Sequence, residues 1–262
     1  MYPYKLKYGD ILTTMEHIES LQIYLNSRYA TETIGNNSAN CIYYLPVIEI
    51  PDGHHIYISL QNASIPYSFY SITATDNTFT FGLVAGALTT YSVPEGNYTI
   101  TQLIGVIQAA MGASYAVSYS SITSKILITH TTSNFIIYAS TINHILGFSK
   151  TTNTTSTSNQ LYGRDCVNLN QIRALNIECN YPTYNVNVAQ PYNQNILATI
   201  PVYVAPFSII TYQNPNNFRT NLYVNKLDQI QIRIIDNNGA LVDMNGIQYQ
   251  MTLQLDCIKF TD

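Results

Sequence analysis

Residues 222–262 read LYVNKLDQIQIRIIDNNGALVDMNGIQYQMTLQLDCIKFTD, and this stretch decides the fold. Apolar residues recur there at intervals of two, first at Ile230, Ile232 and Ile234, with Leu227 three residues before them, and then at Tyr249, Met251, Leu253, Leu255 and Cys257. This period indicates strands with one buried face. Asn238-Gly239 and Asn245-Gly246 tolerate the positive φ of tight turns. We therefore expect two long antiparallel strands whose apolar side needs a second sheet to cover it.

Strand-like runs also occur on both sides of a central region. The expected strands are Cys41–Ile50, His55–Leu60, Ala63–Ile72, Thr78–Leu83, Gln171–Cys179, Ile196–Val204 and Phe207–Tyr212. Short strands with frequent turns are typical of sandwiches, and together with the closing pair they number about eight, as in a jelly roll. We predict an all-β fold, a single jelly-roll sandwich of antiparallel strands with a small α+β insertion domain.

The central region has a different pattern. Thr99 and Gln102 match a capping box, and the apolar residues after them recur at helical spacing, which predicts a helix over about 99–111. Three short strand-like runs follow, and 151–159 contains only Thr, Ser and Asn, which predicts a flexible or exposed linker. The expected division is an arm at 1–37, a discontinuous jelly roll at 38–83 and 161–262, and an insertion domain at 84–160.

The first residues do not alternate convincingly. Asp10 to Tyr24 fits either a short amphipathic helix or an extended arm. Before it, two lysines lie among Tyr2, Tyr4 and Tyr8, so this tail is a candidate contact for nucleic acid or a neighbouring subunit, with a solvated terminus as the simpler interpretation.

The composition is poor in charge and rich in tyrosine. Charged residues make up 10% of the 262 residues, there are 23 Tyr and no Trp, and hydrophobic residues make up 46%. A neutral, Tyr-rich surface is prone to bind other surfaces, which favours a subunit that packs against neighbours. An A+T-rich genome is the alternative cause, although the low lysine content argues against a purely compositional origin.

Charge and hydropathy exclude further classes. The net charge is −4 and the eleven Lys and Arg are scattered, so we expect no specific nucleic-acid binding. The chain starts without an apolar signal region and contains no apolar run of about 18 residues, so we expect a cytosol-like site of synthesis and no transmembrane segment. The N-x-S/T triplets at Asn36, Asn62, Asn97 and Asn153 are then accidents of composition.

The sequence matches no catalytic template, whether nucleophile elbow, phosphate loop or metal-binding histidine motif. His54 and His55 point to opposite faces of a strand, so they cannot chelate one ion in simple β geometry. Asp236, Asp243 and Asn245 lie at expected turns and do not have the spacing of a calcium loop. We expect no catalytic residue, cofactor or metal ion, and no enzymatic activity.

The four cysteines, Cys41, Cys166, Cys179 and Cys257, are widely spaced, which does not favour a disulfide framework or a metal site. Cys257 lies on the apolar phase of the last expected strand and is predicted to be a buried free thiol. Asp165-Cys166 and Glu178-Cys179 place a carboxylate beside a thiol without a nearby histidine, so a reactive thiol is disfavoured.

Three features together resemble a known family. They are the closing stretch LDQIQIRIIDNNG with VDMNG and its long last strand, the insertion VPEGNYTITQLI with ILGF, and the strand at Val167-Asn168-Leu169. They resemble the minor capsid, or penton, proteins of virophages and Polinton-like viruses, relatives of the double-jelly-roll DNA viruses. The resemblance covers most of residues 40–262 and none of the arm.

The resemblance implies a structural capsid protein. It implies a single jelly roll that forms homopentamers at the five-fold vertices of an icosahedral virion and packs against trimers of a double-jelly-roll major capsid protein. The insertion would crown the outer end, where it is the candidate for binding a vertex spike or a host receptor. The arm would lie at the inner end. The protein would be made in the host cytoplasm or a virus factory.

Two other classes remain open. The long loop at 180–195 contains Tyr and Asn that fit a glycan- or receptor-binding jelly roll of a spike or fibre, and a hydrolase with an unrecognised site is a weaker hypothesis. For the subunit interface, the candidate residues are Tyr2, Tyr4, Tyr181, Tyr184 and Tyr192.

Overall fold

The computed structural model describes residues 15–181, 183 and 195–260. They form two compact units, each with its own core. The first unit contains the described residues up to Ser68 and those from Arg173 onward, and the second unit is Phe69–Ile172.

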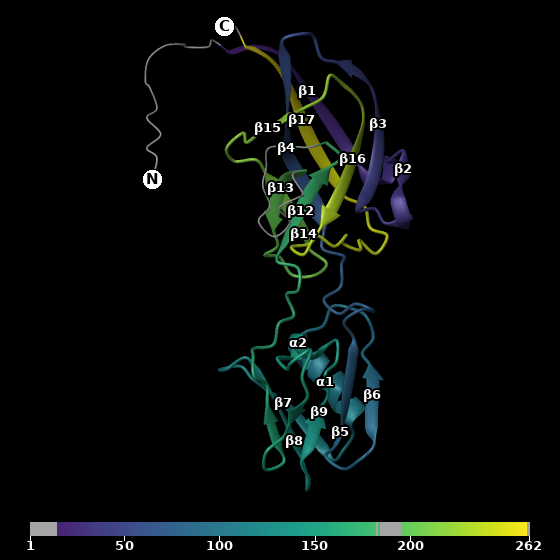
Figure 1. Cartoon of the computed structure of the whole chain (residues 1–262), viewed down its shortest axis with the longest axis vertical. Coiled ribbons are helices and arrows are strands. Elements are labelled where there is room, and N and C mark those ends of the chain that lie inside the picture. Colours follow the sequence, from purple (N-terminus) through teal and green to yellow (C-terminus); the bar gives the residue numbers. More distant parts are fainter. Residues whose placement is uncertain (1–14, 182, 184–194, 261–262) are drawn as a thin grey trace, which may run out of the picture. The chain divides into compact units, whose positions relative to one another are not determined.

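The first unit consists of two five-stranded antiparallel sheets (Figure 1). One sheet has the order β1 (Met15–Asn26), β17 (Gln250–Phe260), β4 (His54–Pro66) and β14 (Ile209–Gln213), and β15 (Thr220–Leu222) also pairs with β4. The other has the order β13 (Ile196–Pro201), β12 (Ala174–Cys179), β16 (Lys226–Ile235), β3 (Asn40–Glu49) and β2 (Glu32–Thr33). We call them the β17 sheet and the β16 sheet.

The strand order is that of a jelly roll. If β14 and β15 count as one interrupted strand and the two-residue β2 is set aside, eight strands remain. In chain order they lie 1-8-3-6 in the β17 sheet and 2-7-4-5 in the β16 sheet. Consecutive strands thus lie in opposite sheets, except for the fourth and fifth, β12 and β13, which are neighbours in the β16 sheet; this is the strand order of a jelly roll. The predicted all-β, single jelly-roll fold is confirmed.

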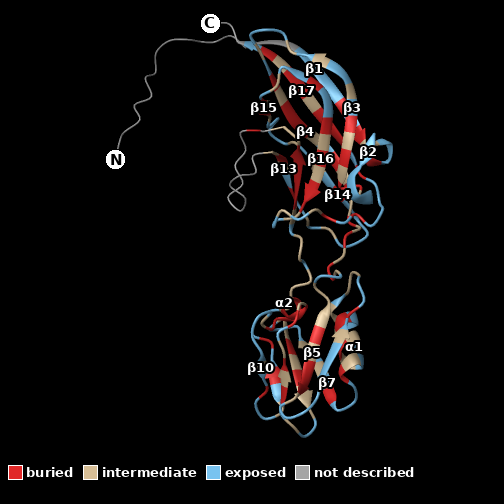
Figure 2. Cartoon of the chain, turned by 45° about the vertical axis from the view of Figure 1, so that its right-hand side comes forward, coloured by how far each residue is buried: buried red, intermediate tan, exposed pale blue. Residues whose placement is uncertain are grey.

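The closing stretch supplies the centre of both sheets. Its apolar residues are buried as predicted from Leu227 to Ile234 and from Tyr249 to Leu255, so the two apolar faces form the core (Figure 2). The predicted pairing is wrong, because β16 pairs with β3 and β12 whereas β17 pairs with β1 and β4. Both Asn-Gly turns lie in the connection that carries the chain from one sheet to the other, with Gly239 at φ 82° and Gly246 at φ 74°.

The N-terminal region contributes a strand to the jelly roll. In β1, Ile23 and Leu25 are buried and pair with Leu253 and Met251 of β17. Of the two alternatives for Asp10–Tyr24, the helix is therefore wrong from Met15 onward, where the chain is extended, and the boundary of the arm at residue 37 is wrong as well. The helical interpretation missed the alternation of 21–25. Residues 1–14 lie outside the described part of the chain.

The second unit contains two smaller antiparallel sheets, one of four strands and one of three. The first has the order β10 (Thr154–Thr155), β9 (Phe135–Ile137), β5 (Thr78–Leu83) and β6 (Leu88–Ser92), and the second has the order β11 (Gln160–Tyr162), β8 (Lys125–His130) and β7 (Tyr115–Ser120). Helix α1 (Ile100–Met111) buries one face against this unit's core, and α2 (Asn143–Leu146) is a single turn. In the described part of the chain, neither helix has the length and apolar character of a membrane span.

The predicted helix and its cap are confirmed. The Thr99 side chain accepts a hydrogen bond from the Gln102 N–H, and the Gln102 side chain accepts one from the Thr99 N–H. Gly112 follows α1 at φ 81° and ψ −178°, a positive φ that favours glycine but lies outside the left-handed helical region, and its N–H donates to the Gln108 carbonyl.

The second unit is larger than the insertion predicted at 84–160. Strand β5, which was assigned to the jelly roll, pairs with β6 and β9 instead, and its Phe79 and Phe81 are buried in the core of the second unit. Strand β4 is a single long strand that ends at Pro66. The chain leaves the jelly roll after Ser68 and returns to it only at Arg173. A local alternating pattern cannot reveal which of two cores buries a strand.

The expected flexible linker at 151–159 is an ordered part of the second unit. The Oγ of Ser156 accepts a hydrogen bond from the Phe135 N–H at 2.8 Å, and the Oδ1 of Asn153 accepts one from the Ala139 N–H at 2.9 Å. Between these residues, β10 pairs with β9. Although the segment lacks apolar residues, its hydroxyl and amide groups hydrogen-bond the neighbouring backbone and fix its path.

Candidate subunit interfaces

The chain joins the two sheets of the jelly roll at two lateral edges. At the first edge, β1 leads to β2 and β3 through the short helix η1 (Ser27–Tyr29) and through η2 (Ile34–Asn36). At the second edge, residues 202–208 lead from β13 to β14, and β15 follows. Because β1 and β14 are the outermost strands of the β17 sheet, the two edges lie on opposite sides of the jelly roll.

The first edge exposes large apolar and aromatic side chains. Tyr24 and Tyr29 are 77% and 76% exposed, and Tyr44 and Val47 of β3 are also more than half exposed. The alternation of β1 buries Ile23 and therefore directs Tyr24 outward. The Tyr44 hydroxyl donates a hydrogen bond to the Glu32 carboxylate at 2.9 Å, which fixes this ring beside β2.

The second edge exposes a different set. Tyr203 and Phe207 are 82% and 84% exposed, and Ile209 and Phe218 are more than half exposed. Singly exposed apolar residues are common, but several at one edge mark a surface for association. The two edges therefore expose different sets of side chains.

Phe207 is also held in a costly conformation. Its φ is 68°, a region that bulky residues avoid at a cost of roughly 1 kcal/mol or more. The backbone around it is fixed, because the Phe207 N–H donates to the Tyr67 carbonyl and the Tyr67 N–H donates to the Ser208 carbonyl. A strained backbone that holds an exposed phenylalanine outward is typical of a functional position.

Two unlike apolar edges on opposite sides favour head-to-tail association. When one surface of a subunit binds a different surface of the next copy, the contact is heterologous, and repeated heterologous contacts close into rings or extend as filaments. A self-complementary dimer would need only one such surface. The arrangement can therefore support a ring of copies.

The outer face of the β17 sheet holds an ion pair in a polar depression of about 420 Å³. The carboxylate of Asp256, whose side chain is 6% exposed, lies 3.2 Å from the Arg219 guanidinium. It also accepts hydrogen bonds from the Ser20 hydroxyl and the Gln254 amide, at 2.6 and 2.8 Å. Arg219 lies over the ring of Tyr57. Because both carboxylate oxygens are engaged, Asp256 fixes the 214–219 connection to the sheet and is not arranged as a general base.

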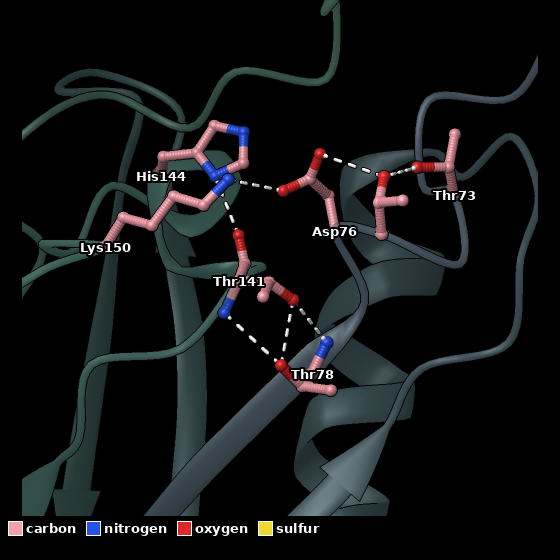
Figure 3. Close-up of polar contacts among 7 residues, drawn as sticks. Thr73, Asp76, Thr78, Thr141, His144 and Lys150 are labelled. Atoms are coloured by element: carbon pink, nitrogen blue, oxygen red, sulfur yellow. Dashed lines mark hydrogen bonds and ion pairs between the residues drawn. The ribbon is translucent and has the colours of Figure 1, made fainter.

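The second unit has a polar cluster that joins residues 73–78 to residues 141–150 (Figure 3). The Lys150 ammonium lies 2.6 Å from Asp76, and the hydroxyls of Thr78 and Thr141 lie 2.8 Å apart. His144 Nδ1 lies 2.8 Å from the Thr141 carbonyl oxygen rather than from a hydroxyl. Asp76 is thus paired with a lysine and His144 with the backbone, so the cluster holds two loops together and does not align a nucleophile with a base.

The predicted interface tyrosines are mostly outside the described residues, which is the case for Tyr2, Tyr4, Tyr184 and Tyr192. Tyr181 is half-buried, and its hydroxyl donates a 2.8 Å hydrogen bond to the Gln229 carbonyl of β16. Most of the loop proposed for glycan binding, together with the tail that carries Lys5 and Lys7, is likewise not described.

The cysteines are free thiols, and their exposure differs from residue to residue. Cys41 and Cys179 are buried, and burial raises the pKa of both thiols, which opposes thiolate reactivity. Cys257 is only half-buried rather than buried as predicted, because the alternation of β17 ends at Leu255, near the register shift of β1 between His17 and Glu19. Cys166 is exposed.

The remaining candidate ligands serve as turn residues. Asp236 Oδ1 accepts hydrogen bonds from the N–H groups of Asn238 and Ala240, and Asp243 Oδ1 accepts one from the Asn245 N–H, which confirms the predicted structural turns. His54 Nδ1 lies 3.0 Å from the Asp52 carbonyl oxygen. The described residues contain no group of three or more His, Cys, Asp or Glu placed to hold a metal ion.

The sequence analysis missed the exposed residues of both edges. It assigned Phe207 to a strand and Tyr24 to a helix or arm. One signal was present for the second edge, because Ala205-Pro206-Phe207-Ser208 combines a proline turn with an aromatic residue at its tip. Exposure itself depends on which strands end the sheets, and local sequence does not give that order.

Comparison with known proteins finds similarity at the level of the fold. The sequence matches no protein-family model and no curated protein. The fold matches the crystal structure of selenomethionine-labelled mavirus penton protein with a TM-score of 0.51 and 9% sequence identity, over 92% of this chain and 100% of that chain. At this identity the match shows the fold alone, and it confirms at that level the resemblance seen in the sequence.

Proposed function

We propose that this chain is a structural capsid protein, a penton that forms homopentamers at the five-fold vertices of an icosahedral virion. The observation that carries the proposal is the fold match, which covers the whole chain of a penton protein. A jelly roll alone serves many functions, but a match over an entire chain, insertion included, is a narrower similarity.

The two lateral edges support the ring that this function requires. In a pentamer each subunit presents one side to its left neighbour and the other side to its right neighbour, so the two contact surfaces differ. The exposed Tyr24 and Tyr29 of the first edge and the exposed Tyr203 and Phe207 of the second edge fit this requirement. We propose that the first edge of one copy binds the second edge of the next.

The finer assignments follow from the same proposal. The pentamer would pack against trimers of a double-jelly-roll major capsid protein, and the second unit would be available to a vertex spike or host receptor. The protein would be located in the virion after synthesis in the host cytoplasm or a virus factory. It would act without catalysis and without specific nucleic-acid binding.

Native mass spectrometry of the purified full chain tests the assembly. We expect a pentamer, or a concentration-dependent equilibrium between monomer and pentamer. A chain that remains monomeric at high concentration, or that forms a trimer, would contradict the penton assignment. Reconstruction of the virion would then locate the subunit directly.

Two single variants test the edge-to-edge contact. Tyr24→Glu alters the first edge, and Phe207→Asp alters the second with a residue that tolerates a positive φ. Each variant alone should lose the pentamer. When mixed, they should form a one-to-one dimer through their remaining intact edges, and no closed ring, because the two altered edges carry like charges and repel each other.

The matched control is Ile122→Asp, which places the same charge on a side chain that is 94% exposed in the second unit. It should leave the pentamer intact. If both edge variants still form pentamers, the assignment of the edges is wrong even though the penton assignment survives. If both are monomeric but their mixture forms no dimer, the contact is not head-to-tail.

A further inference from the structure

The second unit has an open groove beside helix α1, with a volume of about 490 Å³. Tyr91 of β6 lines it on one side, Asn97 and Tyr98 line it where the chain enters the helix, and Gln102 and Gly105 line it along the helix. The groove is shallow and largely open to solvent, so a ligand would lie along it rather than be enclosed. The groove lies within one compact unit and is separate from both lateral edges.

Hydrogen bonds fix the walls of the groove. The Asn97 side chain accepts a bond from the Ser71 N–H at 2.8 Å and donates one to the Phe69 carbonyl at 3.0 Å. The Tyr98 hydroxyl donates to the Pro94 carbonyl at 2.8 Å. The groove is therefore formed before any ligand arrives, which lowers the entropic cost of binding.

Two tyrosines provide aromatic surface at the groove. Burial, followed by the nearby phenol of Tyr91, raises the pKa of Tyr98, so the Tyr98 phenol is neutral at physiological pH. Both side chains are only partly buried and pack against the core of the second unit. Each ring is thus supported by the core while part of its surface stays accessible.

Gly105 leaves the helix side of the groove open. A Cβ built at this position would meet no atom within 4 Å, so the glycine is not required by close packing. In a helix interior, glycine is less stable than alanine by about 0.5–1 kcal/mol. The packing of the fold thus leaves this glycine unexplained, and its effect is to let a ligand approach the helix backbone.

The chemistry of the lining selects one class of ligand. Every described residue that lines the groove is uncharged, so a charged ligand would find no counter-ion there. Aromatic rings pack against the apolar C–H faces of pyranose rings, and amides hydrogen-bond sugar hydroxyls. From the aromatic rings, the neutral amides and the open glycine, we propose that this groove binds a neutral saccharide.

Saccharide binding to the full chain tests the proposal. The probes are the neutral disaccharides lactose, cellobiose and N,N-diacetylchitobiose, with sialyllactose and a heparin disaccharide as acidic counterparts, measured by saturation-transfer-difference NMR and calorimetric titration. We expect saturable binding of at least one neutral probe. Gly105→Gln fills the groove with a good helix former and should weaken binding about tenfold or more. Tyr91→Leu should have the same effect, because it removes an aromatic face.

The matched control is Thr101→Gln, an exposed position of α1 that does not line the groove. It should bind as the unaltered chain does, and all variants should show the same thermal unfolding midpoint within a few degrees. The proposal is overturned if no neutral probe binds, if only acidic probes bind, or if binding survives both groove variants. Self-association that is lost in Gly105→Gln, without saccharide binding, would assign the groove to a second copy and also overturn it.

Discussion

Ionisable side chains lie between the two sheets of the jelly roll, where water does not solvate their charged forms. The hydroxyl of Tyr43 donates to that of Tyr249 at 3.4 Å, and burial raises the pKa of both phenols. In the β16 sheet, Cys179 follows the same rule, because burial raises its pKa from 9.0 to about 11. These groups stabilise the fold only while they remain protonated.

Stability should therefore fall in alkaline solution, and Cys179 should account for part of the loss. Because its folded pKa lies above the unfolded value, its contribution is fully present below pH 9 and is lost as the pH rises toward about 11. Within that window each such group lowers the free energy of unfolding by roughly 1.4 kcal/mol per pH unit. The test is urea unfolding of Cys179→Ala and of the unaltered chain from about pH 8 to about pH 11, a range that spans this window. The free energy of unfolding should decline less steeply with pH in the variant.

The control for this experiment is Cys166→Ala, which removes an exposed thiol and leaves every tyrosine in place. Its pH dependence should follow that of the unaltered chain, so the difference between the two alanine variants isolates the buried thiol. Equal slopes for both variants would show that Cys179 does not remain protonated in the folded state.

At the scale of elements, β1 offers a test of strand alternation at adjacent residues. Leu25 is 4% exposed and packs in the core, whereas Tyr24 is 77% exposed. Leu25→Ala should lower the free energy of unfolding by about 2–5 kcal/mol, and Tyr24→Ala should change it by about 0.5 kcal/mol or less. Urea denaturation measures both, in the Phe207→Asp background so that assembly does not contribute. Equal effects would show that β1 does not belong to the core.

Alternation in the sequence predicted which faces are buried better than which strands are neighbours. The buried faces of β16 and β17, the capped helix at α1 and the turns at Gly239 and Gly246 depend on residues close together in the chain, so local patterns reveal them. Pairing depends on which distant strands compete for the same edge. For this reason the local pattern led to two wrong predictions, that β16 and β17 pair in one sheet and that β5 belongs to the jelly roll.

The same limit applies to the candidate interfaces. The composition pointed to a tyrosine-rich surface, but tyrosines such as Tyr249 are buried, so the residue type alone does not identify an exposed position such as Tyr203. Only the strand order shows that β1 and β14 are the outermost strands of the β17 sheet, so that the side chains at these two edges are exposed.

For the whole molecule, the jelly roll should fold without the second unit. The chain leaves the jelly roll after Ser68 and returns to it at Arg173, and both points are hydrogen-bonded to the connection between β16 and β17. The Ser68 hydroxyl donates to the Met244 carbonyl, and the Ala174 N–H donates to Asn237 Oδ1. Replacing 69–172 with a short Gly-Ser linker should leave a protein with cooperative urea unfolding and a smaller m value, because less surface is exposed on unfolding.

Removal of the residues up to Asn26 is the contrasting deletion. It takes β1 from the sheet and uncovers β17 along its length, so this variant should lose cooperative unfolding and bind a hydrophobic dye. If the variant without 69–172 behaves in the same way, the two units depend on each other for folding.

The central place of β16 and β17 has a consequence for synthesis. Ribosomes add about 5–20 residues per second. The β16 sheet lacks its middle strand until Ile235 has emerged, and the β17 sheet lacks its own until Phe260 has emerged. Until then, the apolar faces of β3 and β4 stay uncovered on the nascent chain, where chaperones can bind them. Strand β1 pairs with β17, so it cannot join the sheet before β17 has been synthesised. In the proposed ring, a growing chain therefore could not offer its first edge to completed subunits. The order of the strands thus delays assembly until translation has passed the jelly roll.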